Sequence, residues 1–272
     1  MPLEDTEKVF GISQADGYQI WQIPLVKVTL PDDFALWLDG FDKLTKLSTS
    51  TEAKARCRID ALIVAVYRSL LQHDLLSAFP GAPRVTLAFE SHLEWGPVLY
   101  KEIPHLCIGK SDYSMFFGEK DHMACHLVIF EAKTGSSVGS TSRGQVLAYM
   151  AMVQASRKSR GQSDWTVWGA LICGDAWFFI QLNMDGKWSE IYLQSKREGW
   201  SEIASMLGSV ILHAQNACKS PLRSSLSSTQ GFSNQKRKSI TPRIASMQLA
   251  NGSEFVEEMK DFLDKDQGPD PA

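Results

Sequence analysis

Glu131 and Lys133 are two charged residues at the end of an apolar run, in the stretch 126–133 that reads His-Leu-Val-Ile-Phe-Glu-Ala-Lys. The run is short, rich in β-branched and aromatic residues and followed by Thr-Gly, which is typical of a buried strand that ends at a turn. Side chains alternate along a strand, so Glu131 and Lys133 lie on the same face. Because burying charge is costly, either the two pair with each other or reach solvent, or Glu131 holds a hard cation and Lys133 acts beside it.

Two further polar residues stand at matching places on the neighbouring elements. Asp112 lies in the middle of residues 106–118, which also have the pattern of a strand, and Gln145 opens a helical pattern over 143–153. The set therefore runs from an aspartate on one strand, through Glu-x-Lys on the next, to a glutamine on the following helix. Such a set suits phosphodiester cleavage, which needs an attacking water, charge neutralisation at phosphorus and help for the leaving oxygen; a hard cation supplies much of this.

This order of residues resembles the PD-(D/E)XK nuclease superfamily. It is most similar to the fungal and oomycete proteins that carry a nuclease-like domain of that type, including those related to Crinkler effectors. The likeness covers roughly residues 50–194, and it departs from the family's name in one place, because Ser111 stands where that name has proline. The resemblance implies an α/β fold with a restriction-endonuclease-like core, in which a mixed central β-sheet is flanked by helices.

The resemblance also implies a metal-dependent nuclease that hydrolyses nucleic acid, DNA more readily than RNA. Asp112 and Glu131 would hold one Mg²⁺ or Mn²⁺, with the backbone carbonyl of Ala132 as a further ligand. This number of carboxylates agrees with the preference of Mg²⁺ for one or two of them together with waters and phosphate oxygens. Lys133 would act on the attacking water and the scissile phosphate, and Gln145 would orient the water or contact the phosphate backbone.

Glu52 has two interpretations. With Thr49 it matches the Ser/Thr-x-x-Glu pattern of a capping box at the start of a predicted helix. In the nuclease superfamily, glutamates of the first helix often reach the metal site, which would make Glu52 a fifth catalytic residue. Arg56 and Asp60 follow at one-turn intervals on the same stripe, so the sequence alone leaves open which of the three faces the cleft.

Two other functions compete with the nuclease. The stretch Gly135-Ser136-Ser137-Val138-Gly139 matches the Gly-x-Ser-x-Gly motif of serine hydrolases, and His213 would complete a Ser…Asp…His order. Against Ser137 as a nucleophile, the next helix is predicted to begin only near Ser142, and no oxyanion-hole segment stands upstream. The other competitor is a catalytically silent nuclease fold that only binds nucleic acid or protein.

Composition sets the remaining limits. The chain has 272 residues, is 44% apolar and 22% charged, and carries a net charge of −3, so it is not a polycation and a nucleic-acid surface has to be local. Its 5 cysteines include no Cys-x-x-Cys pair, which argues against a disulfide framework or zinc ribbon and for a reducing compartment. Neither a signal peptide nor a membrane-spanning run is predicted. We expect an intracellular protein, in the nucleus or cytoplasm, with no membrane partner; the oligomeric state stays open, a dimer included.

The chain divides into three predicted parts. Residues 1–48 form an N-terminal extension packed on the core, 49–218 the nuclease-like domain, and 219–272 a Ser-rich basic disordered segment with a short acidic C-terminal helix. The basic cluster Lys236–Lys238 is either a nuclear-import signal, a phosphate-binding tail or a solvated linker. The apolar periods predict strands near 18–30, 84–90, 107–117, 126–133, 165–172, 176–182 and 190–194, and helices near 32–44, 50–75, 143–158 and 198–217.

Overall fold

A mixed seven-stranded β-sheet forms the centre of the protein, in the order β1-β7-β6-β5-β4-β3-β2. The neighbours β4 and β5 run parallel, as do β1 and β7, and all other neighbours run antiparallel. This confirms the predicted α/β class with a mixed central sheet. The strands are β1 (Ser13–Gln14), β2 (Val85–Tyr100), β3 (Ile103–Phe117), β4 (His126–Lys133), β5 (Val167–Cys173), β6 (Ala176–Leu182) and β7 (Lys187–Gln194).

The computed structural model describes residues 1–16, 21, 26–46, 52–76, 85–117, 126–133 and 139–218. All of these residues belong to one compact unit, Met1–Arg223. The predicted Ser-rich segment, its Lys236–Lys238 cluster and the acidic C-terminal helix lie outside the described residues. The same is true of Thr49 in the predicted capping box and of Ser137 in the Gly-x-Ser-x-Gly motif.

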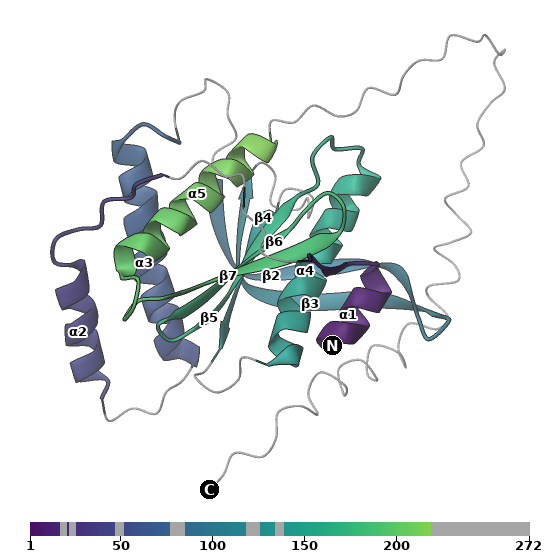
Figure 1. Cartoon of the computed structure of the whole chain (residues 1–272), viewed down its shortest axis with the longest axis horizontal. Coiled ribbons are helices and arrows are strands. Elements are labelled where there is room, and N and C mark those ends of the chain that lie inside the picture. The colour runs from purple at the N-terminus through teal and green to yellow at the C-terminus, as the bar shows by residue number, and fades with distance from the viewer. Residues whose placement is uncertain are drawn as a thin grey trace, which may run out of the picture. The chain divides into compact units, whose positions relative to one another are not determined.

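Helices cover both faces of the sheet. Figure 1 shows α3 and α5 over one face and α4, with the short α1 beside it, over the other. None of the helices in the described part of the chain is long and apolar enough to cross a membrane. The helices are α1 (Leu3–Phe10), α2 (Phe34–Leu44), α3 (Glu52–Gln72), α4 (Ser140–Ser159) and α5 (Trp200–Cys218).

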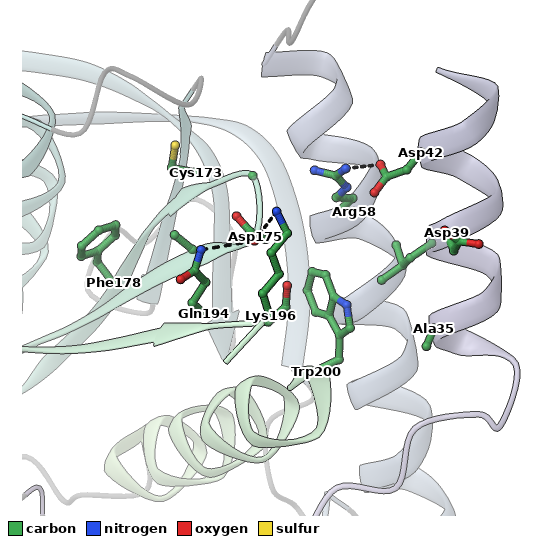
Figure 2. A pocket seen from close by; sticks show the side chains of 14 residues that line it. Ala35, Asp39, Asp42, Arg58, Cys173, Asp175, Phe178, Gln194, Lys196 and Trp200 are labelled. Atoms are coloured by element: carbon green, nitrogen blue, oxygen red, sulfur yellow. Dashed lines mark hydrogen bonds and ion pairs between the residues drawn. The ribbon is translucent and has the colours of Figure 1, made fainter. Parts of the chain in front are cut away.

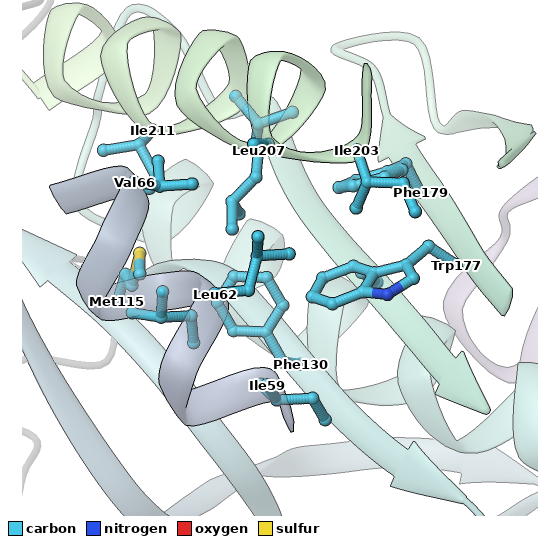
Figure 3. Packing of buried hydrophobic residues seen from close by; sticks show 14 of the residues in the cluster. Ile59, Leu62, Val66, Met115, Phe130, Trp177, Phe179, Ile203, Leu207 and Ile211 are labelled. Carbon is cyan, nitrogen blue, oxygen red and sulfur yellow. The ribbon is translucent and has the colours of Figure 1, made fainter. Parts of the chain in front are cut away.

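The larger hydrophobic core lies between the sheet and the pair α3 and α5. Most apolar residues of α3 recur at helical spacing and point to this face, as their sequence pattern predicts, whereas Val64 and Leu71 are exposed. Figure 3 shows them meeting the aromatic side chains of the sheet and the apolar stripe of α5. The residues in contact include Ile59, Leu62 and Val66 of α3, Phe130 of β4, Trp177 and Phe179 of β6, and Ile203, Leu207 and Ile211 of α5. The core therefore fixes α3 against the strands that carry the predicted carboxylates.

The strand predicted over 18–30 is wrong in its described part. Trp21 and residues 26–30 are irregular. The backbone N–H groups of Val26 and Val28 donate to the hydroxyls of Ser209 and Ser205 on α5, at 2.9 and 3.2 Å, instead of to a neighbouring strand. Helix side chains thus satisfy the donors that a sheet ladder would otherwise take.

The first strand of the β2–β3 hairpin is long. The sequence predicts a first core strand near residues 84–90, which residues 95–100 either extend or follow; the structure continues β2 to Tyr100, so they extend it. The register shifts between Trp95 and Val98, so an irregularity takes up the Gly-Pro pair without ending the strand. Two elements near the N-terminus, α1 and β1, have no counterpart among the predictions, whereas the other predicted helices and strands match the observed elements closely.

Candidate functional site

Asp112 and Glu131 lie where the ladder between β3 and β4 ends. The last register pair joins Tyr113 to Phe130. Beyond it, the Asp112 carboxylate takes over the role of the backbone, because its Oδ2 accepts a hydrogen bond of 2.7 Å from the Ala132 N–H. Both carboxylates are almost fully buried. The Asp112 carboxylate therefore lies where the ladder ends, close enough to Glu131 for its charge to add to burial in raising the pKa of that carboxyl.

Glu131 is bound on one oxygen only. Its Oε1 accepts hydrogen bonds from Lys133 Nζ at 2.9 Å and from Gln145 Nε2 at 2.8 Å. Its Oε2 is buried and has no hydrogen-bond partner among the described residues. Lys133 lies on the same face of β4, and Gln145 lies in the second turn of α4, so the sheet and the helix on its face position this carboxylate together. An unpartnered buried oxygen is rare in folded proteins and marks a place for a ligand.

Tyr149 supports Gln145 from one helical turn further along α4. Its hydroxyl accepts hydrogen bonds from Gln145 Nε2 at 3.0 Å and from the Lys110 N–H at 3.3 Å. The tyrosine ring lies directly on Gly109, where a Cβ atom would come within 2.1 Å of the ring. Tyr149 therefore ties α4 to β3, and only a glycine at position 109 leaves room for it.

Arg56 connects α3 to the same site. Its Nη2 donates to Asp112 Oδ1 and to Glu52 Oε1, the latter at 2.7 Å. Glu52 thus faces the site, but it reaches Asp112 through the guanidinium of Arg56. Asp60 points elsewhere, toward the Tyr113 hydroxyl. Of the three residues that the sequence leaves open, Arg56 makes the direct contact with a predicted catalytic residue.

Glu90 is a member of the site that sequence reasoning missed. The register of β2 and β3 pairs Phe89 with Tyr113 and Ser91 with Ser111, which places Glu90 next to Asp112. Its carboxylate binds Lys110 Nζ at 2.7 Å and lies 3.7 Å from Arg56 Nη1. The Lys110 ammonium lowers the pKa of Glu90.

Glu90 also has an unusual backbone. Its φ is +52°, in the left-handed region that non-glycine residues rarely adopt, and such residues concentrate at functional sites. No feature of the local sequence signals that conformation. The register of the β2–β3 hairpin is the one property that could have placed Glu90 in the site.

The electrostatics of the site favour an added positive charge. Burial raises the pKa of Glu131 to about 7, and it also raises the pKa of Asp112. Burial opposes the charged form of Lys133 as well, but the neighbouring Glu131 charge outweighs it and the pKa of Lys133 is raised. Burial raises the pKa of Tyr149 to about 12, so its phenol stays protonated. Burial thus raises the pKa of both carboxyls although Lys133 binds Glu131 and Arg56 binds Asp112, so an added cation would stabilise their charged forms.

The residues present fit one hard divalent cation. Among the described residues, no three His, Cys, Asp or Glu side chains converge in a group that could hold a metal ion. Asp112 and Glu131 are instead a pair, which is the number that Mg²⁺ takes from protein when waters and phosphate oxygens complete its shell. The unpartnered Glu131 Oε2 is a free oxygen donor of the kind this cation needs. The predicted third ligand, the Ala132 carbonyl, stays a prediction.

A hollow lies one strand away from this site. It has a volume of about 650 Å³ and is bordered by α2, α3, the β5–β6 turn and the end of β7. Cys173, on its wall, is the register partner of Lys133. Figure 2 shows two ion pairs on its wall, Arg58 with Asp42 and Lys196 with Asp175; the second pair is 3.5 Å apart. The hollow thus lies beside the end of β4, although none of the site residues lines it.

His213 does not approach the helix that follows Ser137. It lies on α5, on the face of the sheet opposite to α4, and its ring packs edge-on against the buried Trp168 at 4.7 Å between centroids. Burial lowers the pKa of His213, as expected for a histidine packed into a core. Its position gives no support to a hydrolase triad.

The structure brings four of the five side chains predicted to be catalytic into one site. Asp112, Glu131, Lys133 and Gln145 lie together, as the order of elements predicts. Glu52 joins them through one intermediary.

Comparisons with known proteins add nothing to this geometry. No protein-family model matches the chain, and no curated protein matches it.

Proposed function

We propose that the protein is a metal-dependent nuclease of the PD-(D/E)XK type, which hydrolyses phosphodiester bonds of nucleic acid. The observation that supports it most is the state of Glu131. One of its oxygens is held by Lys133 and Gln145, and the other is buried and has no hydrogen-bond partner among the described residues. A carboxylate held in this way serves as a ligand better than as a structural ion-pair partner, because a structural role would leave no buried oxygen unsatisfied.

Each residue has a role that follows from its contacts. Bound Mg²⁺ or Mn²⁺ would supply a water of lowered pKa and offset charge at phosphorus. Asp112 and Glu131 supply the carboxylate ligands, with the Ala132 carbonyl as a third. Lys133, held at 2.9 Å from Glu131, presents the positive charge that orients the attacking water and meets the phosphate. Gln145 sets the orientation of Glu131, so it is a positioning residue.

The proposed substrate is DNA more than RNA, bound inside the cell, in the nucleus or cytoplasm. The net charge of −3 requires local positive groups for phosphate contact. Lys110, Arg56 and Lys133 line the site, and Arg58 and Lys196 border the adjoining hollow. These side chains, which are now paired with carboxylates such as Glu90, Asp42 and Asp175, are the candidates for contact with phosphates.

The test is cleavage of plasmid, linear DNA and RNA by the purified protein, with Mg²⁺, with Mn²⁺ and with a chelator. Glu131→Gln is expected to abolish the metal-dependent cleavage, because the amide keeps the shape but loses the ligand charge. Lys133→Met is expected to lower the rate by on the order of 100-fold or more while Mn²⁺ still binds.

The matched control is Glu7→Gln. Glu7 also accepts a hydrogen bond from a partly buried donor, Trp188 Nε1 of β7, so its carboxylate is engaged with a strand that carries none of the site residues. It should cleave at the wild-type rate. Cleavage that survives in chelator, or that Lys133→Met leaves intact, would overturn the nuclease assignment.

A second function is favoured by one observation. The Arg56 guanidinium already occupies Asp112 Oδ1, the oxygen that a cation would need. If that contact is permanent, the domain is a catalytically silent nuclease fold that binds nucleic acid or protein. Binding of DNA without cleavage under any metal would identify this case.

A further inference from the structure

Arg56 lies among three carboxylates of the site. It contacts Asp112 and Glu52 through Nη2, and its Nη1 lies 3.7 Å from Glu90 Oε1. These groups come from α3, β3 and β2, so the guanidinium is the point at which three separate elements meet. Its position is that of a cation bound by acidic side chains.

This position conflicts with a metal ion at Asp112. One oxygen of that carboxylate, Oδ2, is committed to the Ala132 N–H and helps to hold β3 against β4. The other, Oδ1, binds Arg56. A divalent cation that uses Asp112 together with the free Oε2 of Glu131 therefore has to take Oδ1 from the guanidinium. Two positive centres on one carboxylate oxygen would repel each other strongly in this buried place.

Arg56 has a nearby place to go. Its side chain is 34% exposed, and its Nε is buried without a hydrogen-bond partner, so the observed position does not satisfy the whole guanidinium. Glu90 is more exposed, at 54%, and faces Nη1 from the solvent side. A short rotation would exchange the contact with Asp112 for one with Glu90, without breaking the fold.

We propose that Arg56 is the resident cation of this site, which holds Asp112 in the metal-free protein and has to move onto Glu90 before a divalent cation can bind. The inference rests on the proposed metal-dependent function. It adds that metal affinity is set by competition between the metal and an arginine of the same chain.

The experiment is a calorimetric titration with Mn²⁺ alone, in the absence of nucleic acid. Arg56→Met, which keeps the length of the side chain and removes its charge, is expected to bind Mn²⁺ about tenfold more tightly or better. The same variant without metal should melt at a lower temperature than the wild type, and Mn²⁺ should raise its melting temperature by more. Arg58→Met is the matched control, because Arg58 is on the same helix, is bound to Asp42 and does not touch Asp112; it should bind Mn²⁺ like the wild type.

Glu90→Gln tests the destination of Arg56. In the wild-type background it should weaken Mn²⁺ binding several-fold, since the displaced guanidinium loses the negative charge of its new partner. In the Arg56→Met background, Glu90→Gln should leave the Mn²⁺ affinity unchanged. Equal weakening in both backgrounds would mean that Glu90 acts on the metal directly, and the proposed movement would be wrong.

The outcomes distinguish failure of the competition between Arg56 and the metal from failure of the metal site itself. Equal Mn²⁺ affinity in wild type and Arg56→Met would overturn the competition and leave the metal site intact. Absence of Mn²⁺ binding in every variant, each checked for native circular dichroism, would overturn the metal site and the competition with it.

Discussion

At the scale of single residues, the site is defined by how each carboxylate is satisfied. Asp112 has both oxygens bound, by Ala132 N–H and by Arg56, whereas Glu131 has one bound and one buried and free. This asymmetry gives the two carboxylates different work. Asp112 connects α3, β3 and β4, whereas Glu131 provides the oxygen that is still available to a ligand.

The raised pKa of Glu131 predicts a pH dependence of stability. An acid whose pKa rises on folding, here from 4.5 to about 7, binds more protons in the folded state across that window. Protonation of Glu131 therefore stabilises the fold at low pH, and this contribution is lost as pH rises through 7. The wild type should lose stability relative to Glu131→Gln between pH 5 and pH 8, by on the order of 1–3 kcal/mol.

Chemical unfolding of both proteins at the two pH values measures this difference. Glu7→Gln again serves as the control, and its free energy of unfolding should change between the two pH values by the same amount as that of the wild type. A stability difference that does not change with pH would show that the Glu131 carboxyl is ionised at pH 5 and that Lys133 outweighs its burial.

At the scale of elements, the hairpin and the helix that follows it form one unit. Tyr149 of α4 binds the Lys110 N–H on β3, and its ring needs the bare backbone of Gly109. The positions of Gln145 and Glu131 depend on this contact, because Tyr149 binds Gln145 and Gln145 binds Glu131.

Gly109→Ala should break this chain of contacts. The new methyl would lie 2.1 Å from a ring carbon, so Tyr149 has to move, and overpacking of this kind costs about 1–3 kcal/mol. Gly40→Ala is the matched control: it lies in α2 with nothing within 4 Å of the added carbon, and alanine there should be neutral or stabilising by up to about 1 kcal/mol. Thermal unfolding of both variants decides the point, and equal melting temperatures would contradict it.

Most of the residues predicted for this site are predicted from the order of strands and helices along the chain. Asp112, Glu131, Lys133 and Gln145 follow from the change of apolar period from 2 to 3.6, since strands and helices place them at fixed positions. Arg56 and Glu90 do not follow in the same way. Each enters the site through a partner far away in sequence, and the left-handed backbone of Glu90 has no local signal.

Partners far away in the sequence also explain why the strand predicted near the N-terminus is wrong. Residues 26–30 have strand character, but their backbone donors are taken by Ser205 and Ser209, nearly 180 residues later in the chain. A local pattern cannot show that a helix side chain will compete with a sheet neighbour.

At the scale of the whole molecule, the N-terminal segment supports the helix that carries Gln145. β1 adds a parallel edge strand to β7, and α1 packs against α4. The contact is close at Gly144, where a Cβ atom would lie 2.3 Å from the Met1 carbonyl oxygen. The hydroxyl of Thr6, which is fully buried, lies 3.1 Å from two carbonyl acceptors, that of Pro2 and that of Gly144, one residue before Gln145.

Thr6→Val should test this support with little change in shape. The valine keeps the volume of threonine but leaves the Gly144 carbonyl without its buried donor, which costs about 1–2 kcal/mol. Because Gly144 precedes Gln145, which orients the proposed metal ligand Glu131, the variant should also lower cleavage and Mn²⁺ affinity several-fold. Thr45→Val is the control, since Thr45 makes a similar hydroxyl bond to the Phe41 carbonyl at the end of α2, far from α4. If Thr6→Val lowers the melting temperature but leaves cleavage at the rate of Thr45→Val, the N-terminal segment stabilises the fold without positioning Gln145.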